Sequence, residues 1–108
     1  MKRCLIALCL AAAGSAQPPW EKNRLRIGQA LYREHCVVCH DIESPKSKKP
    51  GPSFYQLFKR EKMPVSHARP NREYVKVRVK FGGPLMPAFR QWLSDKEIET
   101  LIDYIASK

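Results

Sequence analysis

The sequence predicts an all-α fold of three to four helices. Apolar residues recur at intervals of three and four in two separate stretches, residues 25–35 and 98–105, which is the spacing of one helix face. A capping-box pattern, in which Ser94 is followed three residues later by Glu97, stands just before the second stretch. Segments rich in Gly and Pro separate the two and indicate turns. A chain of 108 residues has room for one domain.

The N-terminus has the form of a cleaved export signal. Lys2 and Arg3 precede an apolar run over residues 4–13, and small residues at 14–16 offer a cleavage site before Gln17. The apolar run is too short to cross a membrane, although an uncleaved anchor is the alternative interpretation. We therefore expect a protein that is periplasmic or otherwise exported.

This signal sets the expected domain boundaries. We assign residues 1–16 to a signal peptide, residues 17–22 to a flexible lead-in and residues 23–108 to the folded domain. Cleavage removes Cys4 and Cys9 and leaves two cysteines, so no disulfide framework is implied.

The folded domain is expected to begin with a helix over residues 23–35. Its apolar stripe comprises Leu25, Gly28, Leu31, Tyr32 and His35. Gly inside a helix costs roughly 1 kcal/mol relative to Ala. Gly28 therefore indicates that another helix crosses closely at this point.

The residues that follow this helix have the spacing of a haem attachment site. Cys36 and Cys39 can each form a thioether with one edge of a porphyrin, and His40 then provides an imidazole to the iron. Redox dithiols and zinc sites share the C-x-x-C spacing. The adjoining His, and the lack of a second C-x-x-C, favour one covalently attached haem c with its iron, around which the helices would pack.

The loop after the motif has a candidate support for the imidazole. Residues 41–52 are rich in turn-forming and charged residues. A metal-bound His normally donates its free ring N–H to an oxygen acceptor. Pro52, in a stiff part of this loop, could present that acceptor as its backbone carbonyl to His40.

A second loop, residues 82–89, carries a candidate sixth ligand. Met86 lies between turn-forming Gly and Pro residues, and a thioether held in a stiff loop suits low-spin haem iron. Two alternatives stay open: Met86 fills the core, or Met63, which also precedes a Pro, is the ligand.

Three further helical segments are predicted. Phe54, Leu57 and Phe58 indicate a short helical turn beside the haem. Asn71 is a suitable N-cap, but the residues after it, 74–81, fit both a strand and a helix. A single strand without a partner is unstable, so we predict a helix. The final helix follows Ser94 and is the expected crossing partner of Gly28. Its apolar stripe comprises Ile98, Leu101, Ile102 and Ile105.

The chain is strongly basic, with a formal net charge of +10 at neutral pH. Loss of the two basic residues Lys2 and Arg3 from +10 leaves +8. Such a surface favours acidic proteins, anionic lipid surfaces or nucleic acid, and an exported haem protein seldom meets nucleic acid. We expect acidic redox partner proteins and possible peripheral contact with membranes, with solvated lysines as the alternative. The predicted docking surface comprises Lys46, Lys48, Lys49 and Lys80.

Together these residues resemble class I cytochrome c, the family of small monohaem electron carriers. The resemblance extends from about Arg24 to Ser107. Its motifs are Cys36-Val37-Val38-Cys39-His40, Gly51-Pro52, Met86-Pro87-Ala88-Phe89 and Leu93-Ser94-Asp95-Lys96-Glu97-Ile98. The family often has glycines after the Gly-Pro pair, whereas residues 54–59 have none.

The resemblance implies the cytochrome c fold and a set of site residues. Cys36 and Cys39 would carry the haem, His40 and Met86 would bind the iron, and the Pro52 carbonyl would support His40. The resemblance also implies that Gly28 and Tyr32 cross the last helix near Tyr104.

The function implied is electron transfer rather than enzymatic catalysis. With both axial positions of the iron filled, a monohaem protein passes single electrons between redox partners by outer-sphere transfer. The protein would act as a monomer or as a subunit of a redox complex. Three alternatives stay open: a small-ligand sensor with an open or labile sixth site, an electron-entry subunit of a dehydrogenase complex, and a dithiol oxidoreductase without haem.

Overall fold

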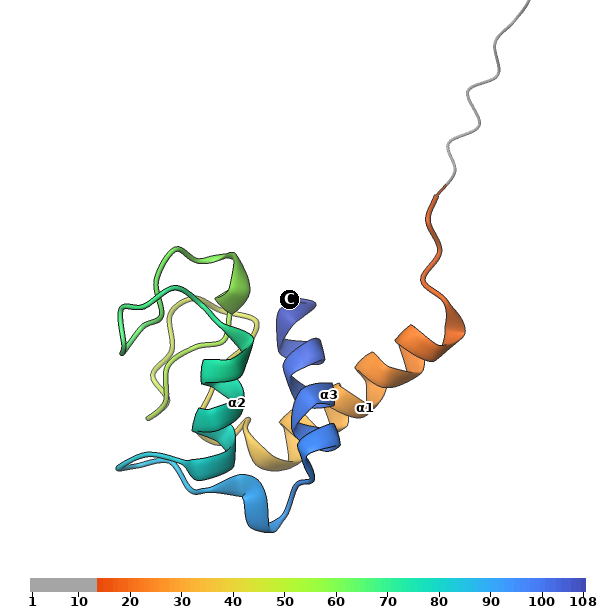
Figure 1. Ribbon diagram of the computed structural model, residues 1–108. Coiled ribbons are helices and arrows are strands. Elements are labelled where there is room, and N and C mark those ends of the chain that lie inside the picture. The colour runs from red at the N-terminus through yellow and green to blue at the C-terminus, as the bar shows by residue number, and fades with distance from the viewer. Residues whose placement is uncertain (1–13) are drawn as a thin grey trace, which may run out of the picture.

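The computed structural model describes residues 14–108, and within that range it contains helices and loops but no strand. Helix α3 packs against both α1 and α2, and long loops connect the helices (Figure 1). None of the helices in the described part of the chain is long and apolar enough to span a membrane. The predicted all-α fold is confirmed. Its elements are α1 (Pro19–His35), η1 (Leu57–Lys59), α2 (Arg72–Phe81), η2 (Phe89–Gln91) and α3 (Asp95–Ala106).

Helix α1 begins earlier than predicted. Pro18 is its N-cap and Pro19 its first residue, so the flexible lead-in expected over residues 17–22 is wrong for Pro19 onward. Proline suits this position because its fixed φ is helical and the first N–H groups of a helix have no intrahelical partner. The backbone N–H of Glu21 donates to the Pro18 carbonyl at 3.0 Å and closes the first turn. Most of the predicted signal peptide, residues 1–13, lies outside the described residues.

The crossing of α1 and α3 occurs at Gly28, as predicted. A Cβ atom on Gly28 would lie 2.5 Å from the Thr100 carbonyl oxygen and 2.6 Å from the Tyr104 Cβ, so only glycine allows this approach. One turn further along α1, the buried Tyr32 ring packs against Tyr104 with ring centroids 5.8 Å apart. The end of α1 is thereby held against α3.

Helix α2 settles the choice between strand and helix for residues 74–81. The Asn71 side chain accepts hydrogen bonds from the backbone N–H groups of Glu73 and Tyr74 at 2.8 and 3.2 Å, which caps the helix as predicted. Val75 and Val79 are buried, whereas the intervening Val77 is 46% exposed. Core-facing residues therefore recur every four positions, as on a helix. The alternation of apolar residues along this segment does not reflect a strand.

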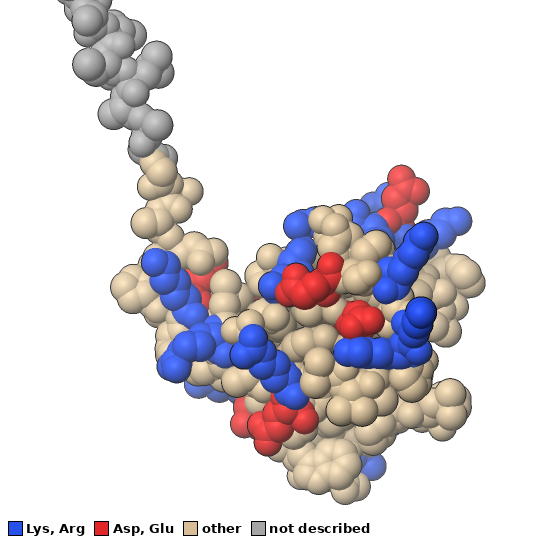
Figure 2. Space-filling view, turned by 180° about the vertical axis from the view of Figure 1, so that it is seen from behind, with Lys and Arg blue, Asp and Glu red and all other residues tan. Residues whose placement is uncertain are grey.

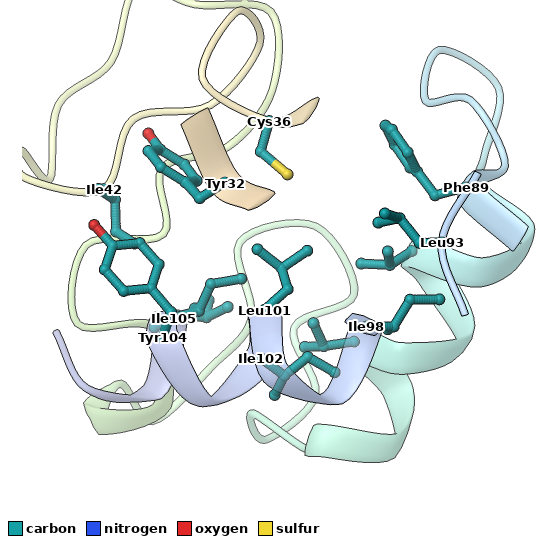
Figure 3. Close-up of a cluster of buried hydrophobic side chains, with 13 residues drawn as sticks. Tyr32, Cys36, Ile42, Phe89, Leu93, Ile98, Leu101, Ile102, Tyr104 and Ile105 are labelled. Carbon is teal, nitrogen blue, oxygen red and sulfur yellow. The ribbon is translucent and has the colours of Figure 1, made fainter. Parts of the chain in front are cut away.

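Helix α3 supplies the centre of the core. Its N-terminus has the predicted capping box: Ser94 Oγ accepts from the Glu97 N–H, and Glu97 Oε2 accepts from the Ser94 N–H. The apolar stripe of α3 lies at the middle of the buried cluster shown in Figure 3. Its four members, each at most 1% exposed, are Ile98, Leu101, Ile102 and Ile105.

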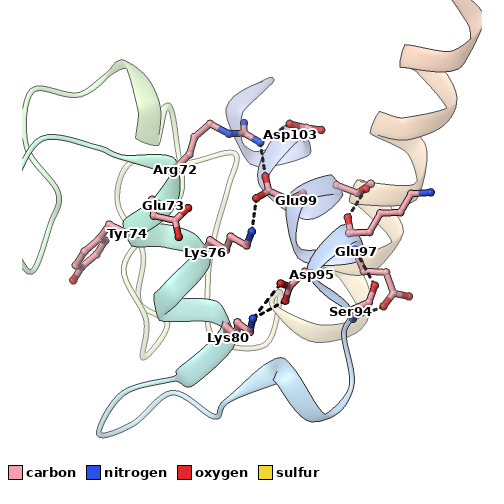
Figure 4. A network of polar contacts seen from close by, with 12 residues as sticks. Arg72, Glu73, Tyr74, Lys76, Lys80, Ser94, Asp95, Glu97, Glu99 and Asp103 are labelled. Carbon is pink, nitrogen blue, oxygen red and sulfur yellow. Dashed lines mark hydrogen bonds and ion pairs between the residues drawn. The ribbon is translucent and has the colours of Figure 1, made fainter.

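Ion pairs join α2 to α3 along one side (Figure 4). Arg72 contacts Asp103 at 2.7 Å and Glu99 at 3.2 Å. The next pairs are Lys76 with Glu99 at 3.0 Å and Lys80 with Asp95 at 2.8 Å. Lys80 was predicted to face a docking partner, but its ammonium forms an ion pair with Asp95 of α3. Because all these groups are partly solvated, each pair contributes only about 0–1 kcal/mol.

The predicted short helical turn at residues 54–58 is present as η1, with an unusual residue before it. Gln56 has a φ of 48° and a ψ of 38°, which is the left-handed region. That conformation costs a residue with a Cβ roughly 1–2 kcal/mol. Residues 54–59, which lack the glycines often found in class I cytochrome c, thus include a strained residue. Leu57, which follows it, is 3% exposed.

The helix crossing can be tested by replacing Gly28 with Ala. Because the added methyl group meets the α3 backbone, we expect a loss of about 1–3 kcal/mol in the free energy of unfolding. Urea denaturation of the haem-loaded protein would measure this loss. The matched control is Ala30→Gly on the exposed side of α1, which should cost about 1 kcal/mol through helix propensity alone. If Gly28→Ala instead stabilises the protein, helix propensity outweighs the steric contact with α3 at this position.

Candidate functional site

The C-x-x-C-H motif forms a single turn that continues from α1. The Cys36 N–H donates to the Tyr32 carbonyl at 2.9 Å, and the His40 N–H donates to the Cys36 carbonyl at 2.9 Å. From α1, the Tyr32 hydroxyl donates to the His40 carbonyl at 2.8 Å. Burial raises the pKa of Tyr32 to about 12, so its phenol stays a hydrogen-bond donor. The last turn of α1 thus positions both ends of the motif.

The two cysteines are free thiols in different surroundings. Cys36 is 7% exposed and belongs to the buried cluster (Figure 3), whereas Cys39 is exposed. Burial, and secondarily the neighbouring Cys39, raises the pKa of the Cys36 thiol to about 11. A redox-active dithiol needs a lowered pKa on its nucleophilic sulfur. The buried Cys36 thiol is therefore not suited to be such a nucleophile.

The His40 imidazole is oriented for metal binding. Its Nδ1 lies 2.7 Å from the Pro52 carbonyl oxygen, the contact expected from the sequence. The ring also stacks on Phe54, with centroids 4.2 Å apart and planes 20° from parallel. Burial lowers the pKa of His40, which keeps the ring neutral. Because a carbonyl can only accept, Nδ1 carries the proton and Nε2 presents its lone pair to a metal ion.

A short segment, Lys49 to Pro52, runs beside the motif and contacts it at three points. One is the contact of Pro52 with His40 described above. In the second, the Gly51 N–H donates to the Cys39 carbonyl at 2.7 Å. The third is made by Lys49. Lys49 Nζ donates to the Val37 carbonyl at 2.6 Å. Lys49, expected on a docking surface, thus binds a carbonyl within the protein instead. A lysine in a polar loop has no local pattern that predicts which carbonyl its side chain will reach.

The two candidate methionines both lie at the edge of the core. Met86 and Met63 are each partly buried and packed against it. The Met86 loop is tight: the Gly83 N–H donates to the Met86 carbonyl at 2.9 Å, and Gly82 has a φ of 72°, which favours glycine. Met63 lies in a second closed loop, in which its carbonyl accepts from His67 at 3.1 Å. Met86 as the sixth ligand stays a prediction.

The residues of this site fit haem c. Two free thiols lie in the C-x-x-C spacing, and a neutral imidazole with an available Nε2 follows them. Partly buried apolar side chains at the edge of the core offer surface for a porphyrin. They are Leu31, Val37, Phe54, Phe58, Met63 and Met86. A zinc site would need four ligands, and residues 14–108 hold no group of three or more His, Cys, Asp and Glu side chains in metal-binding proximity.

The helical fold and this attachment site together define a c-type cytochrome domain. The family described as "Cytochrome C oxidase, cbb3-type, subunit III" has a model that matches residues 23–105, more than three quarters of the chain, and the protein belongs to this family. No curated protein and no solved structure matches the chain significantly. Membership confirms the predicted cytochrome c fold and the covalently bound haem c with its iron.

The contact between Gly51 and His40 gives a direct test of the site. A Cβ on Gly51 would lie 2.6 Å from His40 Nδ1 and 2.7 Å from the Cys39 carbonyl oxygen. We therefore expect Gly51→Ala to displace the imidazole, which should alter the absorption spectrum of the haem-loaded protein and lower its resistance to urea. The control is Lys48→Gln, which changes an exposed residue of the same loop. Identical spectra and stabilities for both variants would contradict the close packing at His40.

Proposed function

We propose that the protein transfers single electrons, with His40 and Met86 as the two axial ligands of the haem iron. The observation that carries this proposal is the orientation of His40, whose Nδ1 is bound to the Pro52 carbonyl so that Nε2 is free to coordinate. Haem supplies a one-electron ferric–ferrous couple when bound. The chain's own residues keep the imidazole neutral, fix its plane against Phe54 and surround it with apolar side chains.

An ion pair supports Met86 rather than Met63 as the second ligand, since both methionines lie in loops closed by internal hydrogen bonds. The Met86 loop is closed at its ends by the ion pair between Lys80 and Asp95, at 2.8 Å, in addition to its internal hydrogen bond. A flexible side chain loses less entropy on coordination when its backbone is already ordered. With a thioether in the sixth position the iron has no open site, which favours an electron carrier over an enzyme.

Replacing each methionine separately tests the ligand assignment. We expect Met86→Ala to open the iron to added carbon monoxide or cyanide and to lower the midpoint potential, because thioether ligation raises it. The weak charge-transfer band of the oxidised protein should disappear. Met63→Ala is the matched control and should keep that band. The reverse pattern would make Met63 the ligand.

The same measurements on the unmodified protein test the sensor alternative. A ferrous protein that binds carbon monoxide readily without any substitution would have an open or labile sixth site and would act as a small-ligand sensor. Tight exclusion of carbon monoxide supports the electron carrier.

A second candidate function is electron relay within a larger redox complex. The matched family's own description names an oxidase subunit, and this favours a subunit over a free carrier. Native gel electrophoresis after gentle solubilisation would separate the two possibilities. A subunit would migrate with a larger assembly, and a free carrier would migrate alone.

Of the four lysines proposed to dock an acidic redox partner, Lys46 and Lys48 are the two that are free to contact it. Both are exposed in the loop that follows the motif. Lys49 and Lys80, by contrast, bind groups within the protein. Figure 2 shows that on one face of the molecule basic and acidic side chains are interspersed. Steering would therefore depend on a small group of charges near the haem site rather than on the net charge.

Stopped-flow electron transfer to an acidic acceptor tests this surface. If Lys46 and Lys48 steer the encounter, the second-order rate should fall steeply as salt rises, because the Debye length shortens to about 8 Å at physiological ionic strength. Replacing both lysines with Gln should flatten that dependence. The control is the equally charged double variant Lys22→Gln, Lys96→Gln, which changes exposed residues on α1 and α3. Equal slopes for the two double variants would leave Lys46 and Lys48 as ordinary solvated residues.

We also propose that the protein is exported and loses residues 1–16, as the form of its N-terminus suggests. The intact mass of the protein purified from its native compartment tests this. A mass that includes residues 1–16 would indicate an uncleaved anchor instead.

A further inference from the structure

Lys49 makes unusually many contacts for a lysine in a polar loop. Its ammonium donates to the Val37 carbonyl at 2.6 Å and lies 3.4 Å from the His40 carbonyl oxygen. It also pairs with Asp41 at 3.1 Å. Its side chain is 33% exposed, so the ammonium lies partly within the protein rather than in solvent. Neighbouring Lys48 is exposed and contacts none of these groups.

All the partners of the Lys49 ammonium belong to the haem-attachment turn or to the residue directly after it. Val37 lies between the two cysteines, and His40 is the proposed iron ligand. The carbonyls at the end of a helical turn have no partner further along the turn. A cation placed against them satisfies these acceptors and interacts favourably with the negative end of the turn.

The charge of Lys49 is fixed in place by these contacts. An exposed lysine samples many rotamers, and water and salt screen its charge. An ammonium held by a carbonyl and a carboxylate stays at one distance from the site, where the lower dielectric of the protein strengthens its field. Lys49 is therefore the lysine of this loop whose charge acts most strongly on His40 and the iron that it binds.

We propose that Lys49 is a positioning residue of the haem site, which orders the turn carrying His40 and whose charge favours the ferrous state. The proposal rests on the proposed role of His40 as an axial ligand. Oxidation adds one positive charge to the site, and a fixed cation nearby opposes it, so Lys49 raises the midpoint potential. Asp41 offsets part of this effect, since its carboxylate has the opposite sign and lies beside the ammonium. The balance between these two side chains then tunes the potential.

The magnitude can be bounded by Coulomb's law. In a medium of effective dielectric constant about 20, a fixed unit charge at a separation on the order of 10 Å changes the ferric–ferrous equilibrium about tenfold. For a one-electron couple, tenfold corresponds to about 59 mV. A solvated lysine has a much smaller effect, because water screens it.

Spectroelectrochemical titration of four haem-loaded variants tests the proposal. We expect Lys49→Gln to lower the midpoint potential. The decrease should correspond to a change of up to about tenfold in the ferric–ferrous equilibrium constant. The matched control, Lys48→Gln, removes the same charge one residue away and should leave the potential nearly unchanged. Lys49→Arg should keep it near that of the original protein, because the positive charge remains. Asp41→Asn should raise it, since the offsetting negative charge is lost.

The outcomes separate this proposal from the proposed function. The absorption spectrum of the unmodified protein reports whether His40 and Met86 bind the iron, independently of Lys49. Equal potentials for Lys49→Gln and Lys48→Gln would overturn the proposal even if both spectra show normal ligation. Should Lys49→Gln fail to fold, the Asp41→Asn variant decides: a raised potential supports the fixed charge pair, and an unchanged or lowered one refutes it.

Discussion

The close crossing of α1 and α3 at Gly28 is the contact on which the rest of the structure depends. Without a Cβ at that point, the α1 backbone lies against Thr100 and Tyr104. Helix α1 then continues without a break into the turn that holds the cysteines. Tyr32, one turn after Gly28, contacts Tyr104 through its ring and the His40 carbonyl through its hydroxyl. The position of α3 in the core therefore determines where His40, the proposed iron ligand, lies.

His40 is held by groups from two separate parts of the chain, α1 and the loop that leads from the motif to η1. Tyr32 comes from α1, Pro52 from the loop after the motif, and Phe54 from the approach to η1. An imidazole held in this way keeps its plane and its tautomer. The surroundings of the Cys36 thiol differ, since it lies within the apolar core. The attachment site thus combines a polar support for the imidazole with an apolar environment for one thiol.

Local patterns made most of the fold predictable, and also the contact between His40 and the Pro52 carbonyl. The caps at Asn71 and Ser94 involve groups two or three residues apart, and the structure has both. The helix start at Pro19 was not predicted, because prolines occur both in flexible segments and at the first position of helices. The partners of Lys49 and Lys80 lie 12 and 15 residues away along the chain. Such contacts depend on how loops and helices meet, which residue spacing alone does not show.

The ion pairs between α2 and α3 also define the axial register of the two helices. The basic residues Arg72, Lys76 and Lys80 and the acidic residues Asp95, Glu99 and Asp103 are each spaced by four, one turn of helix. Sliding α2 by one turn, about 5.4 Å, would leave a charge at each end of the series without its partner. The register in turn fixes the point where α2 ends at Phe81 and the loop bearing Met86 begins. These electrostatic contacts, together with the packing of Val75 and Val79 in the core, thereby favour one starting position for the loop of the second candidate ligand.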